Sequence, residues 1–216
     1  MKQVKVWDLA TRLFHWLLVL LVVAAWLTIE NRMIEAHEFI GHSIFALLLF
    51  RLMWGFIGST TARFSNFVKP PLKALSYLKK SLSLQADYST GHNPAGGWMV
   101  IIMLIFFGFQ TISGMLGNND LGFSGALSDS ISKSLSDTMT QLHALNFNIL
   151  LALIWLHLVA VFFYVLVKKT NLVKAMCSGR KLENQVKLND SLSFASLFRA
   201  CASFAIALAI AYWIMF

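Results

Sequence analysis

The stretch that decides the fold is residues 142–167, LHALNFNILLALIWLHLVAVFFYVLV, an apolar run that carries two histidines. This run is longer than the roughly 20 residues with which an α-helix crosses the hydrocarbon core of a bilayer. Four more apolar runs come close to that length, at residues 13–29, 39–57, 98–116 and 200–216. The sequence therefore predicts an all-α, polytopic membrane protein with five transmembrane helices.

The composition of the 216-residue chain agrees with this prediction. Hydrophobic residues make up 57% of the chain and charged residues only 13%, against roughly 25% charged residues in soluble domains. This balance excludes a soluble globular protein. The two cysteines, Cys177 and Cys201, form no CxxC pair, so the sequence indicates neither a disulfide framework nor a sulfur-ligated metal site.

The basic residues predict the orientation of the chain. Lysine and arginine total 18 against 10 acidic residues, a net charge of +8, which in a membrane protein signals orientation and not nucleic-acid binding. A cytoplasmic N-terminus places 16 of the 18 basic residues inside and gives net charges of +12 inside and −4 outside. We therefore expect a membrane protein with a cytoplasmic N-terminus and an outer C-terminus, whose inner loops contact anionic lipid.

Three further segments carry expectations. No small-residue cleavage site follows Trp26, so we expect the first apolar run to stay in the mature protein. Residues 70–84 alternate lysines with leucines at helical spacing, which predicts an amphipathic helix on the membrane surface. Residues 117–141 are rich in Gly, Ser and Asp and read as a loop or a docking surface.

Four histidines lie at two matched depths. His143 and His157 are 14 residues apart, which on an α-helix is about 21 Å along the axis and roughly 40° around it. His15 precedes the outer end of the first span by the same 14 residues and so lies level with His157. His37 opens the second span at the level of His143. The spacing therefore predicts an outer pair, His37 with His143, and an inner pair, His15 with His157.

Two layers of paired imidazoles favour two b-type haems, each with bis-histidine ligation. A zinc site would need four ligands at one point, and each layer offers two. A proton relay would need carboxylates inside the spans, and the span interiors hold no Asp or Glu. A cofactor-free transporter or anchor subunit with structural histidines is the alternative, and a visible absorption spectrum distinguishes the two.

His42 and Arg51 complete the second span. His42 lies five residues after His37, about 140° around the helix, so we assign it to packing. Arg51 comes 14 residues after His37, at the level of the inner pair. We expect its guanidinium to neutralise a propionate of the inner haem, with snorkelling to the inner headgroups as the alternative.

A series of motifs resembles one family. They are Val6-Trp7-Asp8 with Arg12 and His15-Trp16, His37-x3-Gly41, RLMWGF at 51–56, Ala62-Arg63-Phe64 with Phe67, GHNPAGGW at 91–98, His143 and His157 at their spacing, and NLVKAM at 171–176. Over residues 4–181 the chain resembles the bacterial cytochrome b561 family and, more closely, the b-type cytochrome subunits of membrane-bound nickel–iron hydrogenases.

The resemblance implies a four-helix bundle with two haems b, over residues 1–181, with residues 182–216 as a linker and an additional transmembrane helix. It implies axial ligands at His15, His37, His143 and His157, and it favours His37 over His42. It also implies an electron-transfer subunit that links the quinone pool to a redox partner, often periplasmic, such as a c-type cytochrome or a hydrogenase-like oxidoreductase subunit.

Two residues of the family motifs, Arg12 and His92, are further candidates for cofactor contact. His92 lies in a Gly-His-Asn-Pro turn before the third span, where it either shapes the helix entry or donates a hydrogen bond to a haem propionate or a quinone oxygen. The fifth span is rich in small residues, which predicts close helix packing or self-association.

Overall fold

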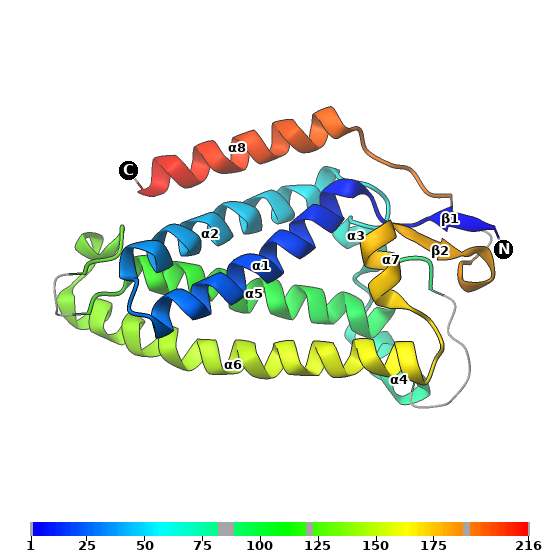
Figure 1. The fold of residues 1–216 in the computed structure, drawn as a ribbon, viewed down its shortest axis with the longest axis horizontal. Helices are drawn as coiled ribbons and strands as arrows, with labels where there is room; N and C mark the ends of the chain where they lie inside the picture. Colours follow the sequence, from blue (N-terminus) through cyan, green and yellow to red (C-terminus); the bar gives the residue numbers. More distant parts are fainter. Residues whose placement is uncertain (1, 82–88, 120–122, 188–190, 216) are drawn as a thin grey trace. The chain divides into compact units, whose positions relative to one another are not determined.

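The computed structural model describes residues 2–81, 89–119, 123–187 and 191–215 (Figure 1). Its five long helices are apolar enough to cross a membrane: α1 (Leu9–Glu30), α2 (Ile34–Ile57), α5 (Pro94–Leu116), α6 (Lys133–Leu166) and α8 (Leu197–Met215). The predicted all-α membrane fold with five spans is therefore confirmed. Each helix begins three to nine residues before the apolar run that predicted it.

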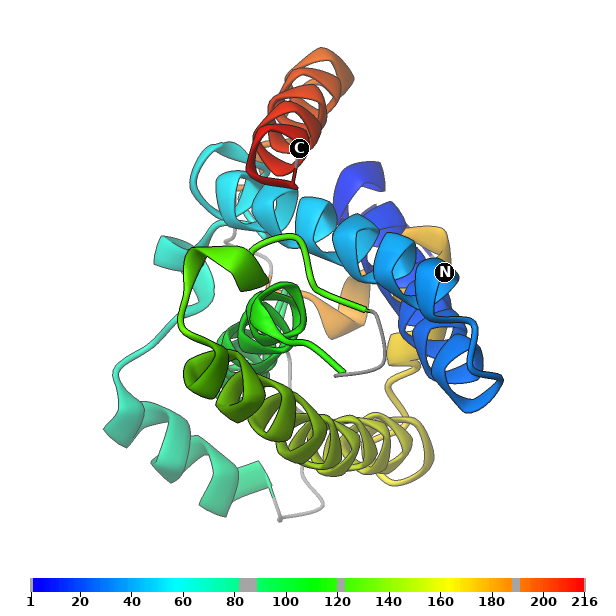
Figure 2. The same cartoon turned by 90° about the vertical axis from the view of Figure 1, so that its left-hand side faces the viewer.

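The remaining elements are short. They are α3 (Phe64–Phe67), α4 (Pro71–Ser81), α7 (Leu172–Ser178), the 3-10 turns η1 (Ser128–Ser130) and η2 (Glu183–Gln185), and the strands β1 (Gln3–Lys5) and β2 (Arg180–Leu182). Figure 2 shows α4 as a separate helix in the cyan-green part of the chain, joined to α3 by an extended stretch. The predicted amphipathic helix at 70–84 is thus confirmed over Pro71–Ser81, and its last residues lie outside the described ones.

The loop predicted over 117–141 is shorter than expected, because α6 already begins at Lys133. Ser132 precedes that helix, and its Oγ accepts a hydrogen bond from the backbone N–H of Leu135 at 3.4 Å. A serine in this position satisfies an N–H group that has no partner inside the helix. The helix start is therefore set by capping, and the prediction of a loop was wrong for the polar first turns of α6.

The chain forms two compact units, and each long helix contributes to both. The first unit comprises residues 1–13, 52–102 and 154–200. Strands β1 and β2 pair antiparallel in it, with Val4 opposite Lys181. Just beyond them, the N–H groups of Val6 and Trp7 donate to Gly179 O at 2.8 and 3.1 Å. Val6, Trp7 and Ala175 form a buried cluster there, which fixes the N-terminal segment against α7.

The second unit comprises residues 14–51, 103–153 and 201–216. In it, one face of α2 is buried and includes Leu47 and Phe50. The Phe50 ring meets Phe204 of α8 edge to face, with centroids 5.8 Å apart. On α8 the buried residues of this unit are small and recur every four positions, at Ser203, Ala207 and Ala211. Small side chains on one stripe let helices approach closely, in agreement with the packing expected of this span.

Candidate functional site

The second unit brings His37 of α2 and His143 of α6 together. Their ring centroids lie 6.4 Å apart and the ring planes are inclined by 83°. Both side chains are only partly exposed. The two histidines expected to form the outer pair therefore face each other from different helices.

The ring of His37 is oriented by the backbone of α1. Its Nδ1 lies 2.8 Å from Ala25 O, and because a carbonyl oxygen only accepts, the proton is on Nδ1. The lone pair is then on Nε2, the nitrogen at the far end of the ring. A histidine that donates one N–H to a carbonyl while the other nitrogen stays basic is the usual arrangement of a metal-ligating imidazole.

The ring of His143 has the same tautomer, set by α5. Its Nδ1 lies 2.9 Å from Gln110 O and 3.2 Å from Ser113 Oγ. Its Nε2 lies 3.0 Å from Gln110 Nε2, where the amide N–H donates and the ring nitrogen accepts. Both imidazoles of the outer pair therefore carry the lone pair on Nε2.

Three polar residues that the sequence reasoning missed support this arrangement: Gln110, Ser113 and Asn146. Asn146 is buried, and its Nδ2 donates to Gln110 Oε1 at 2.6 Å and to Phe106 O at 3.0 Å. This holds the Gln110 side chain beside His143. The sequence contains a pattern that could have indicated these residues. Polar residues three positions apart, and so on one helix face, occur inside two apolar spans: Gln110 with Ser113, and His143 with Asn146.

Gly114 of α5 lets the His143 ring lie against the helix backbone. A Cβ atom on this glycine would meet His143 Cε1 at 3.0 Å and Nδ1 at 3.2 Å. Such contacts are closer than packed carbon atoms ordinarily allow. The absence of a side chain at this position is therefore part of how the imidazole is seated.

His42 lies apart from this pair in its interactions. Its Nε2 is 3.9 Å from Glu38 Oε1, one helical turn earlier on α2. The packing role expected of His42 from the spacing of the two α2 histidines stays a prediction.

The expected inner pair falls in two units, and each residue is described in its own surroundings. His15 of α1 belongs to the second unit, where its ring meets Trp16 edge to face with centroids 5.0 Å apart. His157 of α6 belongs to the first unit and is partly exposed. Arg51 of α2, in the second unit, is only 2% exposed, so its side chain is enclosed by protein.

Arg12 and His92 both lie in the first unit, in well-defined contacts. Arg12 Nε donates to Met176 O at 3.2 Å, and its Nη2 donates to Cys177 O, so the guanidinium caps the C-terminal carbonyls of α7. The ring of His92 packs against Trp7, with centroids 4.8 Å apart, and against Phe67, with centroids 4.6 Å apart. Both residues thus help to build the fold around the N-terminal segment.

The outer pair fits a haem group. Two imidazoles face each other from two helices, each with its Nδ1–H bound to a backbone carbonyl and its lone pair on Nε2. Because Nε2 of His143 accepts a hydrogen bond from the Gln110 amide at 3.0 Å, this amide would have to move away for His143 to bind iron. A helical bundle in an apolar environment offers this kind of cofactor site.

Comparison with known proteins agrees with this chemistry. Residues 6–179 match the family model described as prokaryotic cytochrome b561. No curated protein and no solved structure matches the chain. The family is one of helical membrane proteins that bind b-type haem and transfer electrons. Since the match covers most of a chain with five membrane-spanning helices, this multi-pass membrane cytochrome belongs to the prokaryotic cytochrome b561 family.

Proposed function

We propose that the protein holds two haems b and moves electrons across the bacterial inner membrane between the quinone pool and a periplasmic redox partner. In this proposal His37 and His143 ligate the outer haem, and His15 and His157 the inner one. The N-terminus is cytoplasmic and the C-terminus periplasmic. The partner is a c-type cytochrome or a hydrogenase-like oxidoreductase subunit.

The observation that carries the proposal is the geometry of the outer pair. The two rings face each other at a centroid distance of 6.4 Å, and backbone carbonyls of α1 and α5 hold both Nδ1–H groups. These hydrogen bonds fix the ring orientations and raise the basicity of the ligating nitrogens. They therefore prepare both rings for axial coordination before a cofactor is present.

The inner haem is supported by the register of the helices. His157 follows His143 by 14 residues on the continuous helix α6, so the two rings project within roughly 40° of each other at levels about 21 Å apart. Arg51 follows His37 by the same interval on α2 and is 2% exposed. An enclosed guanidinium is a suitable partner for a propionate at the inner level.

In the proposed mechanism some residues bind the haem iron and others compensate charge on the haem. Bound haem iron supplies the one-electron redox chemistry. The four imidazoles would hold the iron atoms, and the carbonyl groups bound to the imidazoles would tune the redox potential. Arg51 would compensate the negative charge of a haem propionate. Arg12 lies in the first turn of α1 and His92 just before α5, both in the first unit. We propose that they contact a haem propionate or a quinone headgroup there.

Haem content per chain tests the ligand assignment. The purified protein should show a reduced b-type spectrum with about two haems per chain, as two bis-histidine sites require. Replacing His37 or His143 by Ala should remove one haem, and replacing His15 or His157 the other. His42→Ala is the matched control on α2 and should retain both.

The potentials of the lost haems identify the two sites. If His37→Ala and His143→Ala remove the same redox component, and His15→Ala and His157→Ala the other, the pairing holds. Full haem content in any one of these four variants would exclude that residue as a ligand. A short-chain quinol added to membranes should reduce the haems, and no reduction would exclude the quinone link.

A further inference from the structure

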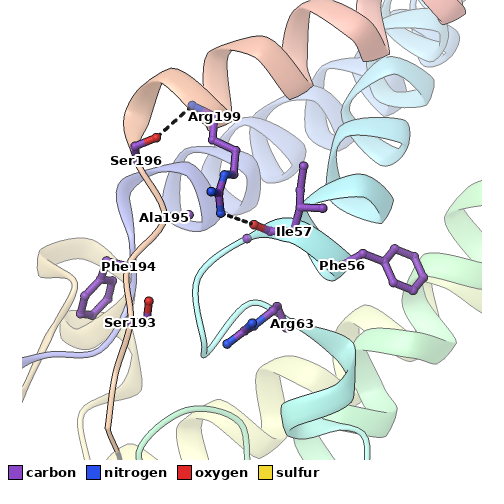
Figure 3. A pocket seen from close by; sticks show the side chains of 9 residues that line it. Phe56, Ile57, Arg63, Ser193, Phe194, Ala195, Ser196 and Arg199 are labelled. Atoms are coloured by element: carbon purple, nitrogen blue, oxygen red, sulfur yellow. Dashed lines mark hydrogen bonds between the residues drawn. The ribbon is translucent and has the colours of Figure 1, made fainter.

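A pocket of about 510 Å³ lies within the first unit, between the end of α2 and the start of α8 (Figure 3). Nine residues line it: Phe56, Ile57, Gly58, Arg63, Ser193, Phe194, Ala195, Ser196 and Arg199. Four of them belong to the segment around α2 and α3, inside the family match, and five to residues 193–199, beyond it. The C-terminal segment therefore completes a pocket that the matched region alone does not contain.

The wall contributed by the C-terminal segment is firmly attached. The backbone N–H of Thr60 donates to Ser193 O at 2.9 Å, and the N–H of Ser193 donates to Thr60 Oγ1 at 2.9 Å. The N–H of Ala195 donates to the buried Ser59 Oγ at 3.0 Å. The linker is thus held in place on both sides of Phe194, and the pocket is a built feature of this unit.

The lining is positively charged. Arg63 and Arg199 reach toward the pocket from different segments (Figure 3), and no described lining residue is acidic. The Nε of Arg63 is buried and has no hydrogen-bond acceptor among the described residues. A third cation, Lys5, lies with its Nζ 4.5 Å from the centre of the Phe194 ring. An anion in this pocket would meet two guanidinium groups, which bind phosphate oxygens bidentately.

The start of α8 adds to the positive potential. Ser196 Oγ accepts a hydrogen bond from the N–H of Arg199 at 3.3 Å and so caps the helix. A 19-residue helix places the positive end of its dipole here, which favours a nearby negative group. The cap and Arg199 reach the pocket from the C-terminal segment, and Arg63 reaches it from the segment after α2.

The rim of the pocket is apolar and exposed. Phe56 is 72% exposed and Ile57, the next residue in the lining, is 48% exposed. Both lie at the end of the membrane-spanning helix α2, which is the level of lipid headgroups. A free phosphate has no apolar part that could cover this rim, whereas the acyl chains of a phospholipid can cover it. Basic pockets between transmembrane helices bind acidic headgroups.

We propose that this pocket binds the phosphodiester headgroup of an acidic phospholipid, with Arg63 and Arg199 on the phosphate and the acyl chains along the apolar rim. The fifth helix and its linker thereby give this cytochrome a lipid site that the family-matched region alone lacks. Since Arg199 Nη1 also donates to Ile57 O at 3.4 Å, the same side chain joins α8 to the end of α2.

Lipid titrations of the full-length protein test the proposal. The probes are phosphatidylglycerol, phosphatidylcholine with the same acyl chains, and inorganic phosphate, with binding followed by native mass spectrometry and by the unfolding temperature. Phosphatidylglycerol should bind and raise the unfolding temperature, and the other two should not. Each arginine replaced by Gln should weaken the phosphatidylglycerol affinity roughly fivefold, so R63Q/R199Q should lose most of the effect.

K79Q/K80Q is the matched control, because it removes two charges from α4 and leaves the pocket intact. Its phosphatidylglycerol affinity should equal that of the unmodified chain. Arg63→Gln alone keeps the hydrogen bond between Arg199 and Ile57, so it reports on lipid binding even if the double variant folds poorly. Equal losses in R63Q and K79Q/K80Q would overturn the proposal in favour of general surface charge, and equal stabilisation by inorganic phosphate would overturn it in favour of a free-anion site.

Discussion

The His143 imidazole is held on three sides by α5. Gln110 binds both ring nitrogens through its carbonyl and its amide, Ser113 Oγ lies 3.2 Å from Nδ1, and Gly114 leaves room for the ring edge. A ring fixed in this way cannot shift without lengthening a hydrogen bond. We therefore expect a single added methyl group at Gly114 to change the orientation of the His143 ring.

Gly114→Ala should weaken haem retention at the outer pair by roughly tenfold, the lower range for changes that disturb a ligating histidine. The added Cβ would meet the His143 ring at 3.0 Å. Gly108→Ala, on the same helix, is the control, because a Cβ there meets nothing within 4 Å and alanine is a better helix former. Haem content and redox titration of the two variants test this prediction. Equal haem content and equal potentials in Gly114→Ala and Gly108→Ala would show that Gly114 does not determine the position of the His143 ring.

Arg51→Leu should lower the midpoint potential or the occupancy of the inner haem. Loss of the enclosed positive charge leaves a propionate uncompensated, which disfavours the reduced, more negative state of the site. Arg51→Lys should cause a smaller change, because an ammonium keeps the charge but not the bidentate geometry. Redox titration measures both, and two unmoved potentials in Arg51→Leu would assign Arg51 a role in packing alone.

The sequence predicts the pairing of His37 with His143 but not the residues that orient the two rings. Depth along a helix follows from the rise per residue alone, so counting residues is enough to match the levels of two histidines. Which polar residue of α5 faces His143 depends on the rotation of that helix about its axis, and the hydropathy of the span does not specify it. The roles of Gln110 and Ser113 therefore depend on how the helices pack. Helix packing cannot be predicted by counting residues along one helix.

At the scale of elements, the spans were predictable because hydropathy is averaged over a whole membrane crossing. Their starts were not, because single capping residues set them. Asp8 Oδ1 accepts from the N–H of Thr11 at 2.6 Å and begins α1, and Asn93 Oδ1 accepts from the N–H of Gly96 at 2.7 Å and begins α5. The β1–β2 pairing joins residues 3–5 to residues 180–182. No local sequence pattern predicts a pairing between segments so far apart in the chain.

The small-residue stripe of α8 predicts a face-specific response to added volume. Ala207 is fully buried, whereas Ala209 of the same helix is exposed. Ala207→Leu should therefore destabilise the protein by about 1–3 kcal/mol, as overpacking does, and Ala209→Leu by less than about 0.5 kcal/mol. Thermal unfolding measures the difference. Both variants should keep their haem, since α8 carries no proposed ligand, and equal stabilities would contradict the packing of this face.

At the scale of the whole molecule, the charge distribution predicts how the chain is oriented in the membrane. Reporter fusions after Lys80 and Lys187 should be active in the cytoplasm, and a fusion after Asp129 in the periplasm, because basic loops are retained inside. The three sites sample three different connections between spans. A cytoplasmic signal from the Asp129 fusion would reverse the proposed orientation and exchange the faces assigned to the two haems.

The hydrogen bond from Val6 N to Gly179 O joins the first and last residues of the family match. Four spans lie between them, and an even number of crossings returns a chain to the side from which it started. The matched region is thus closed on itself, with neighbouring ends, the condition under which proteins tolerate circular permutation and terminal fusion. The fifth span, α8, therefore follows the matched region without interrupting the connections between its four spans.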